Sequence, residues 1–246
     1  MASQAAQELI QRHPLQRLDS PSRGASALLH ITGLASFAYS FAYLVLNPNP
    51  INDSYGWHFQ YLTIIGLALS TATFAFGLLA DLTLSRRLFA VKNALSVASA
   101  PIECLITILY WGLRAIDTSL VLPPWAPVLL LRDDLSFHFM PAFTLTLDLL
   151  FFSPPYAIAA LPALALSGAI AFGYWFWIEQ CFTYNQFYPY PIFDVLDTPG
   201  RVGLFAASAG LMALATGALV WLYGVVNGRV DEGRLGKERS GNVKGE

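Results

Sequence analysis

Apolar residues dominate six stretches of this chain, and polar residues, prolines or glycines separate one stretch from the next. Each stretch reaches about 20 residues, the length that an α-helix needs to cross roughly 30 Å of hydrocarbon. The stretches are residues 27–46, 56–80, 93–113, 135–153, 157–178 and 202–226. The pattern therefore predicts an all-α fold, a membrane helix bundle with about six transmembrane helices.

Helix-breaking motifs lie where such a bundle needs its turns. NPNP (47–50) ends the first stretch, PPWAP (123–127) fills the third loop, and SPP (153–155) predicts a tight turn. The sequence has no internal repeat and no low-complexity tract. We expect one six-span membrane domain over residues 26–228, with a polar tail over 1–25 and a charged, disordered tail over 229–246.

Composition strengthens the membrane assignment. The chain is 55% hydrophobic and 12% charged, about half the charged fraction usual in soluble domains. A net charge of −2 gives no electrostatic basis for binding nucleic acid. Cys104 and Cys181 are too few for a disulfide framework. We expect a multi-pass protein of the endoplasmic reticulum, another endomembrane or the plasma membrane, in contact with membrane lipids.

The distribution of Lys and Arg predicts the orientation. The two tails and the second loop hold eleven of these residues: Arg12, Arg17, Arg23, Arg86, Arg87, Lys92, Arg229, Arg234, Lys237, Arg239 and Lys244. The opposite side holds only Arg114, Arg132 and Arg201. Both termini are therefore expected in the cytosol.

Four polar residues inside the predicted spans are candidates for chemistry. His138 and Asp148 lie in the fourth span, Thr63 in the second and Glu103 in the third. From the helical rise, Thr63, Glu103 and His138 share the outer half of the bundle. Asp148 lies about 15 Å along the helix from His138, so it is not the hydrogen-bond partner of that histidine.

Each candidate also has a structural interpretation. Membrane threonines often bond the carbonyl four residues earlier, which we expect of Ser70, Thr71 and Thr73. His30 and His58 lie nearer the membrane boundaries and are weaker candidates than His138. An intramembrane acid is a functional candidate by default, although Glu103 and Asp148 would equally serve as hydrogen-bonding contacts between helices. Pro141 removes a helical donor beside His138, which predicts a bend there.

Other chemistries fit the inventory less well. A zinc hydrolase needs about three ligands, and His138 is expected to be the only well-buried histidine. The sequence contains no G-x-S-x-G elbow, phosphate loop or CxxC motif, and no cofactor or metal is implied. A proton-coupled transporter could use Glu103, His138 and Asp148 as a relay, but no inverted repeat supports it. A hydroxyl nucleophile with a histidine base remains.

Several motifs resemble the androgen-induced protein family of multi-span eukaryotic membrane proteins. The resemblance runs from about Tyr55 to Arg201. It rests on YGWHFQYLT (55–63), ADL (80–82), His138 ten residues before Asp148, GYWFWIEQ (173–180), YPYP (188–191) and PGR (199–201).

The resemblance implies a function. Members of that family are threonine hydrolases that act on fatty acid esters of hydroxy fatty acids, and their nucleophile and base match Thr63 and His138. We therefore expect an intramembrane lipid-ester hydrolase whose acyl chains lie among spans two, three and four. Glu103 and Asp148 are possible accessory polar residues. The alternative is a non-enzymatic lipid-binding or transport protein with the same fold.

Overall fold

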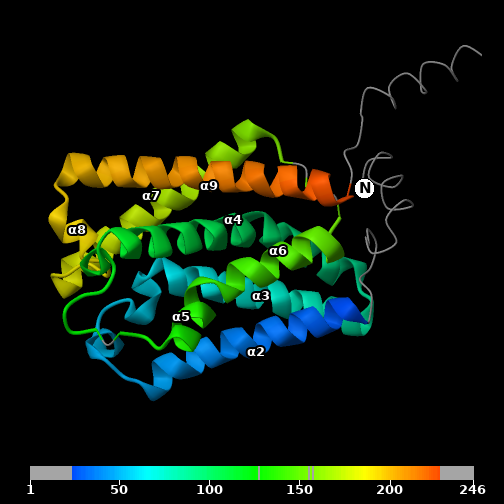
Figure 1. Ribbon diagram of the computed structural model, residues 1–246, viewed down its shortest axis with the longest axis horizontal. Coiled ribbons are helices and arrows are strands. Elements are labelled where there is room, and N and C mark those ends of the chain that lie inside the picture. The colour runs from blue at the N-terminus through cyan, green and yellow to red at the C-terminus, as the bar shows by residue number, and fades with distance from the viewer. Residues whose placement is uncertain (1–23, 127, 155, 157, 228–246) are drawn as a thin grey trace, which may run out of the picture.

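The computed structural model describes residues 24–126, 128–154, 156 and 158–227, and every regular element in these ranges is a helix (Figure 1). The long helices are α2 (Ala25–Leu46), α3 (Leu62–Thr83), α4 (Arg86–Ile116), α7 (Ala160–Asn185) and α9 (Thr198–Asn227). The shorter helices are α5 (Leu131–His138), α6 (Met140–Phe152) and α8 (Ile192–Val195), with 3₁₀ turns η1 (Pro50–Asp53), η2 (Trp57–Gln60) and η3 (Thr118–Leu120). The expected tails lie outside the described residues, apart from residues 24 and 25.

The helices form an up-and-down bundle. Five are long and apolar enough to cross a membrane, and α5 with α6 supplies a sixth crossing if the bent pair counts as one span. This confirms the all-α membrane fold. The start of α2 and the end of α9 lie at the same end of the bundle (Figure 1). The α2–α3, α4–α5 and α7–α9 connections gather at the opposite end, which we call the loop end.

Local geometry explains two of the predicted helix boundaries that differ from the structure. The second span begins at Leu62 rather than at residue 56, since Gly56 adopts φ 85° and the η2 turn follows it. Only a residue without a Cβ adopts this left-handed conformation freely. The third helix begins at Arg86 rather than at residue 93, because the Ser85 hydroxyl caps it by accepting from Leu88 N at 3.4 Å.

The fourth span is broken beside His138. A continuous helix over 135–153 was expected, yet α5 ends at His138 and α6 starts at Met140, with a bend of 45°. Pro141 occupies the first turn of α6, where its missing N–H leaves no gap in the hydrogen bonding. The bend predicted from Pro141 is therefore confirmed, and it places His138 at a helix end.

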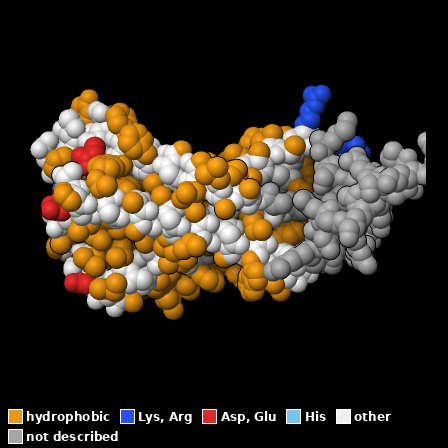
Figure 2. All heavy atoms as spheres, turned by 90° about the horizontal axis from the view of Figure 1, so that it is seen from above, with side chains coloured by type: hydrophobic (Ala, Val, Ile, Leu, Met, Phe, Trp, Pro, Cys, Tyr) orange, Lys and Arg blue, Asp and Glu red, His pale blue; other side chains and the backbone are white. Residues whose placement is uncertain are grey.

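The surface is largely apolar, as a lipid-facing surface must be. Figure 2 shows hydrophobic side chains over most of one face, with acidic groups gathered at one end. Large side chains that point outward include Leu161, Phe172, Phe176 and Leu214, each at least 68% exposed. Soluble monomers rarely expose apolar patches of this extent. The protein is a multi-pass membrane protein.

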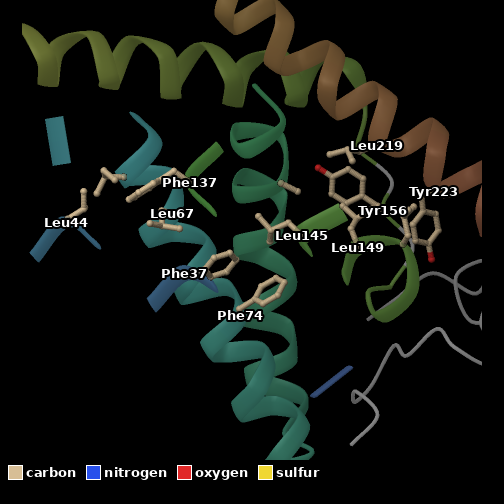
Figure 3. Packing of buried hydrophobic residues seen from close by; sticks show 13 residues of the cluster. Phe37, Leu44, Leu67, Phe74, Phe137, Leu145, Leu149, Tyr156, Leu219 and Tyr223 are labelled. Atoms are coloured by element: carbon tan, nitrogen blue, oxygen red, sulfur yellow. The ribbon is translucent and has the colours of Figure 1, made fainter. Parts of the chain in front are cut away.

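Aromatic packing fixes the spacing of the central helices (Figure 3). Phe37 of α2 and Phe74 of α3 are fully buried, with ring centroids 5.4 Å apart in an edge-to-face arrangement. A Cβ on Gly33 would lie 2.4 Å from the Phe74 ring, so this close approach of α2 and α3 requires glycine. The core thus holds α2, α3, α4 and α6 together and positions the residues at the loop end.

Candidate functional site

Thr63 lies in the first turn of α3, directly after the η2 turn. Its side chain is 8% exposed, and Oγ1 is 3.4 Å from the Tyr190 hydroxyl. The first-turn N–H groups of a helix form the positive end of its dipole, which stabilises negative charge nearby. Thr63 therefore occupies a position where a developing alkoxide or oxyanion is favoured.

His138 is the last residue of α5, and its ring is held on two sides. The Tyr110 ring of α4 stacks on the imidazole with centroids 3.4 Å apart and planes within 3°. The Thr107 hydroxyl donates to the His138 carbonyl at 2.7 Å, and this carbonyl lies at the break between α5 and α6. The imidazole is thus fixed in position and orientation at the loop end.

Asp134 is the partner of His138 that the sequence reading missed. Its Oδ1 lies 2.9 Å from His138 Nδ1, and the Arg114 guanidinium pairs with its other oxygen. This arrangement makes Nδ1 the donor and leaves Nε2 as the free acceptor. A signal was present in the sequence, since Asp134 and His138 are four residues apart and share one helix face.

One cavity of about 740 Å³ brings the two main candidates together. It lies at the loop end between α2, the start of α3, the α4–α5 connection and α5, and both Thr63 and His138 line it. We call it the wide cavity. His58 also lines it, and burial lowers the pKa of His58 to about 4, so this ring is neutral at physiological pH. Sequence reasoning placed His58 at a membrane boundary, but it is 3% exposed.

Tyr190 is a second residue that the sequence reading left without a role. The YPYP segment brings its hydroxyl to Thr63, and its ring packs edge to face on Tyr61, with centroids 5.3 Å apart. Burial raises the pKa of Tyr190 above its usual value, so the hydroxyl keeps its proton. Tyr190 is thus a neutral hydroxyl beside Thr63 that can donate or accept a hydrogen bond.

Glu103 does not join this site. It is fully buried, Ser70 donates to its Oε1 at 2.9 Å, and it lines neither the wide cavity nor the apolar cavity described below. The side-chain bonds expected within α3 are confirmed, because Ser70, Thr71 and Thr73 each donate to the carbonyl four residues earlier. The shared depth of Glu103 and Thr63 therefore does not bring them into one site.

Asp148 belongs to a separate buried network. Its Oδ2 lies 2.7 Å from Lys92 Nζ and its Oδ1 lies 3.1 Å from His30 Nε2. His30 Nδ1 lies 2.7 Å from Asp81 Oδ2, and the Ser26 hydroxyl donates to the same carboxylate. The four ionisable side chains of this network, which we call the ionic network, are each at most 1% exposed.

The ionic network corrects two expectations. Lys92 was assigned to a cytosolic loop, but it lies inside α4, which begins at Arg86, and its ammonium contacts the Asp148 carboxylate of α6. His138 was expected to be the only well-buried histidine, whereas His30 is 1% exposed and His138 is 9% exposed. Asp148 is not a partner of His138, as predicted. Glu103, His138 and Asp148 have separate partners, so they do not form the relay that a transporter would use.

An apolar cavity of about 100 Å³ adjoins the wide cavity, and we call it the narrow cavity. It lies between α3, α4, α7 and α9. The acyl chains were expected among spans two, three and four; the narrow cavity adjoins the second and third spans and also the fifth and sixth, while the wide cavity adjoins the fourth. The loop that carries Tyr190 closes against α9 and brings these helices to the site.

Comparison with known proteins places the chain in a family. The sequence profile described as FAR-17a/AIG1-like protein matches residues 25–224. A protein of Schizosaccharomyces pombe described as UPF0641 membrane protein PJ4664.05 is 37% identical over 198 residues, which cover 80% of this chain and 88% of that protein. No solved structure gives a significant match. The resemblance to the androgen-induced family is confirmed, and the chain belongs to the FAR-17a/AIG1-like family of membrane proteins.

Proposed function

We propose that this protein is an intramembrane hydrolase of lipid esters, in which Thr63 is the nucleophile and His138 the base. The observation that carries the proposal is the shared wide cavity, into which α3 brings Thr63 and α5 brings an imidazole held through Nδ1 by Asp134. A hydroxyl, an imidazole and an orienting carboxylate form the arrangement that activates hydroxyl nucleophiles on unrelated folds.

The reaction has two halves. Thr63 Oγ attacks the ester carbonyl carbon while His138 Nε2 accepts the hydroxyl proton. The tetrahedral intermediate collapses, the bond to the alkoxy oxygen breaks, and His138 returns the proton to the leaving alkoxide. Water then attacks the acyl-threonine with His138 as base. The fatty acid leaves and Thr63 regains its proton.

Two features would stabilise the oxyanion of each intermediate. The Tyr190 hydroxyl lies 3.4 Å from Thr63 Oγ1 and can donate to an oxyanion, and the positive end of the α3 dipole lies at Thr63. The Thr63 hydroxyl contacts Tyr190 rather than His138 among the described residues. The mechanism therefore requires that substrate binding bring the Thr63 hydroxyl and His138 Nε2 into contact, since catalytic hydrogen bonds often form only in the complex with substrate.

The membrane setting suits a hydrophobic ester as substrate, because such a molecule partitions into lipid and reaches the site from there. Membership of the family supports fatty acid esters of hydroxy fatty acids as the class. The polar groups of the wide cavity support a substrate with one oxygenated end.

Covalent labelling with a fluorophosphonate tests the proposal in purified protein in detergent. An activated Thr63 hydroxyl becomes modified in the wild type and not in Thr63→Ala. Thr71→Ala is the control, since the Thr71 hydroxyl is bonded to its own helix at Leu67 O. Absence of labelling at Thr63, together with absence of ester hydrolysis, would favour the non-enzymatic lipid-binding alternative.

A further inference from the structure

Thr63 lies where two cavities of different character meet. It lines both the wide cavity and the narrow cavity, together with Tyr110, Val121 and Tyr190. An ester carbonyl beside Thr63 therefore has space on two sides. One part of the substrate extends toward α7 and α9, and the other extends toward α5 and the loop end.

The narrow cavity is suited to a hydrocarbon chain. Its walls include Ile106 and Leu109 of α4, Ile170 of α7, and Ala209 and Met212 of α9. Its serines, Ser167 and Ser208, each donate to a carbonyl of their own helix at 2.8 Å, and the Tyr174 hydroxyl donates to Gln60 O at 3.0 Å. Polar groups away from Thr63 are therefore satisfied within the protein, and an alkyl chain needs no polar partner there.

The wide cavity is larger and its lining, although still mainly apolar, includes more polar groups. Its volume of about 740 Å³ compares with about 100 Å³ for the narrow cavity, and its lining includes Asn47, Asn49 and His58. A branched group or a polar end therefore has more room and more polar partners in the wide cavity than in the narrow cavity.

The position of the base decides which part of the ester lies on which side. His138 lines the wide cavity and does not line the narrow one. His138 must protonate the leaving alkoxide, so the alcohol part lies on its side. The acyl part stays bonded to Thr63 during the first half of the reaction and extends the other way.

We propose that the narrow cavity binds the unbranched acyl chain of the ester, while the wide cavity binds the alcohol part, including a branched secondary alcohol with a polar end. This inference rests on the proposed function and deepens it, because it assigns each half of the substrate to a place. Selectivity for the acyl chain then comes from α4, α7 and α9, and tolerance of the alcohol from the loop end.

Ala209→Phe tests the assignment by filling the narrow cavity from α9. Its matched control is Ala206→Phe on the same helix, where the side chain is exposed on the surface of the bundle and does not line the cavity. Both variants are assayed in nanodiscs on two ester series, one with acyl chains of increasing length and one with alcohols of increasing length. Leu109→Ala enlarges the same cavity and serves as the second variant if Ala209→Phe does not fold.

The expected result is a selective change in acyl preference. Ala209→Phe should lower hydrolysis of long acyl chains relative to short ones by about tenfold or more, since one methylene in an apolar pocket changes selectivity by roughly 10–200-fold. Its preference among alcohols should match that of the wild type. Leu109→Ala should raise the relative rate on methyl-branched acyl chains. An equal loss on all chain lengths, or a shift in alcohol preference instead, overturns the assignment.

A binding measurement separates this inference from the proposed function. A fatty acid with a terminal diazirine is photolysed with the wild type, and the labelled peptides are identified by mass spectrometry. Labels on α7 or α9 that Ala209→Phe suppresses support the narrow cavity as the acyl site, even if no ester is hydrolysed. If the labels appear there but no ester is hydrolysed, the proposed hydrolase activity is wrong and the acyl-binding site still stands. Labels confined to the loop end overturn the assignment whatever the activity.

Discussion

Lys92 Nζ of α4 lies 2.7 Å from Asp148 Oδ2 of α6, and neither side chain is exposed. His30 lies between Asp148 and Asp81, with one ring nitrogen near each carboxylate. The network therefore sets two basic side chains, Lys92 and His30, against two acidic ones, Asp148 and Asp81. The ionic network thus joins α2, α3, α4 and α6.

Replacing Lys92 by Met should strongly destabilise the protein. The change removes the cation that pairs with the buried Asp148 carboxylate. Breaking a buried ion pair typically costs about 3–5 kcal/mol. Thermal unfolding in detergent measures the effect. The double variant Lys92→Met with Asp148→Asn restores neutrality and should recover much of the loss. Arg87→Met, which removes an exposed cation from the same helix, should change little. Equal stability of Lys92→Met and wild type would contradict the assigned network.

Thr63→Ala and His138→Ala should each abolish ester hydrolysis with near-normal folding. The Thr63 hydroxyl contributes little to stability, since hydrogen bonds between membrane helices average about 0.6 kcal/mol. Loss of an activated hydroxyl or its base lowers the rate by roughly 10⁴ or more. The double variant should be no slower than either single variant, because the pair acts as a unit. Activity of Thr63→Ala at the wild-type level would refute the mechanism.

Asp134→Asn should lower kcat by about 10²–10⁴-fold and leave KM nearly unchanged. The amide can hold the wrong tautomer of His138, which removes the acceptor at Nε2 while the substrate cavities stay intact. Arg114→Gln is the control, because it keeps the contact between Asp134 and His138 and should cost less. If Asp134 had only a structural role, Asp134→Asn and Arg114→Gln would both lower stability, and Asp134→Asn would not lower kcat selectively over KM. Steady-state kinetics in nanodiscs and thermal unfolding together distinguish the catalytic role of Asp134 from a structural one.

His58 should make the fold less stable in acid. Its pKa is about 4 in the folded protein, below the value of about 6.5 in an unfolded chain, so the unfolded state binds more protons between these values. Stability therefore falls as pH drops from about 7 to 4, by at most ~1.4 kcal/mol per pH unit from this group. Gln does not titrate, so the melting temperature of His58→Gln should fall less between pH 7 and pH 4 than that of the wild type. An unchanged pH dependence would mean that His58 is not the responsible group.

Both termini should face the cytosol. The excess of Lys and Arg remains on the same side after Lys92 is counted as part of the bundle rather than of the loop. The start of α2 and the end of α9 lie on one side of the bundle. Protease added to sealed microsomes should remove tags from both ends. Protection of both tags would show that the orientation is the opposite of the one predicted. Protection of one tag alone would contradict the even number of crossings.

The sequence alone was sufficient for the membrane class, the helical fold and the approximate spans. This is because a chain in hydrocarbon must satisfy its backbone groups within helices of a set length. It also selected Thr63 and His138 as candidates, which line one cavity, although for these residues the family resemblance added more than their pattern. Exact helix ends were missed where local geometry decides them, at the left-handed Gly56, at the Ser85 cap and at the break after His138.

The partners of the buried polar groups were decided by tertiary structure. Sequence gives the depth of a residue along its own helix, but it does not give the direction of its side chain or the helix that lies opposite. Glu103 and Thr63 share a depth and do not share a site, whereas Asp148 meets Lys92 and His30 from 56 and 118 residues away. Depth is a property of one helix, while a site is formed by the faces of several, and only packing brings those faces together.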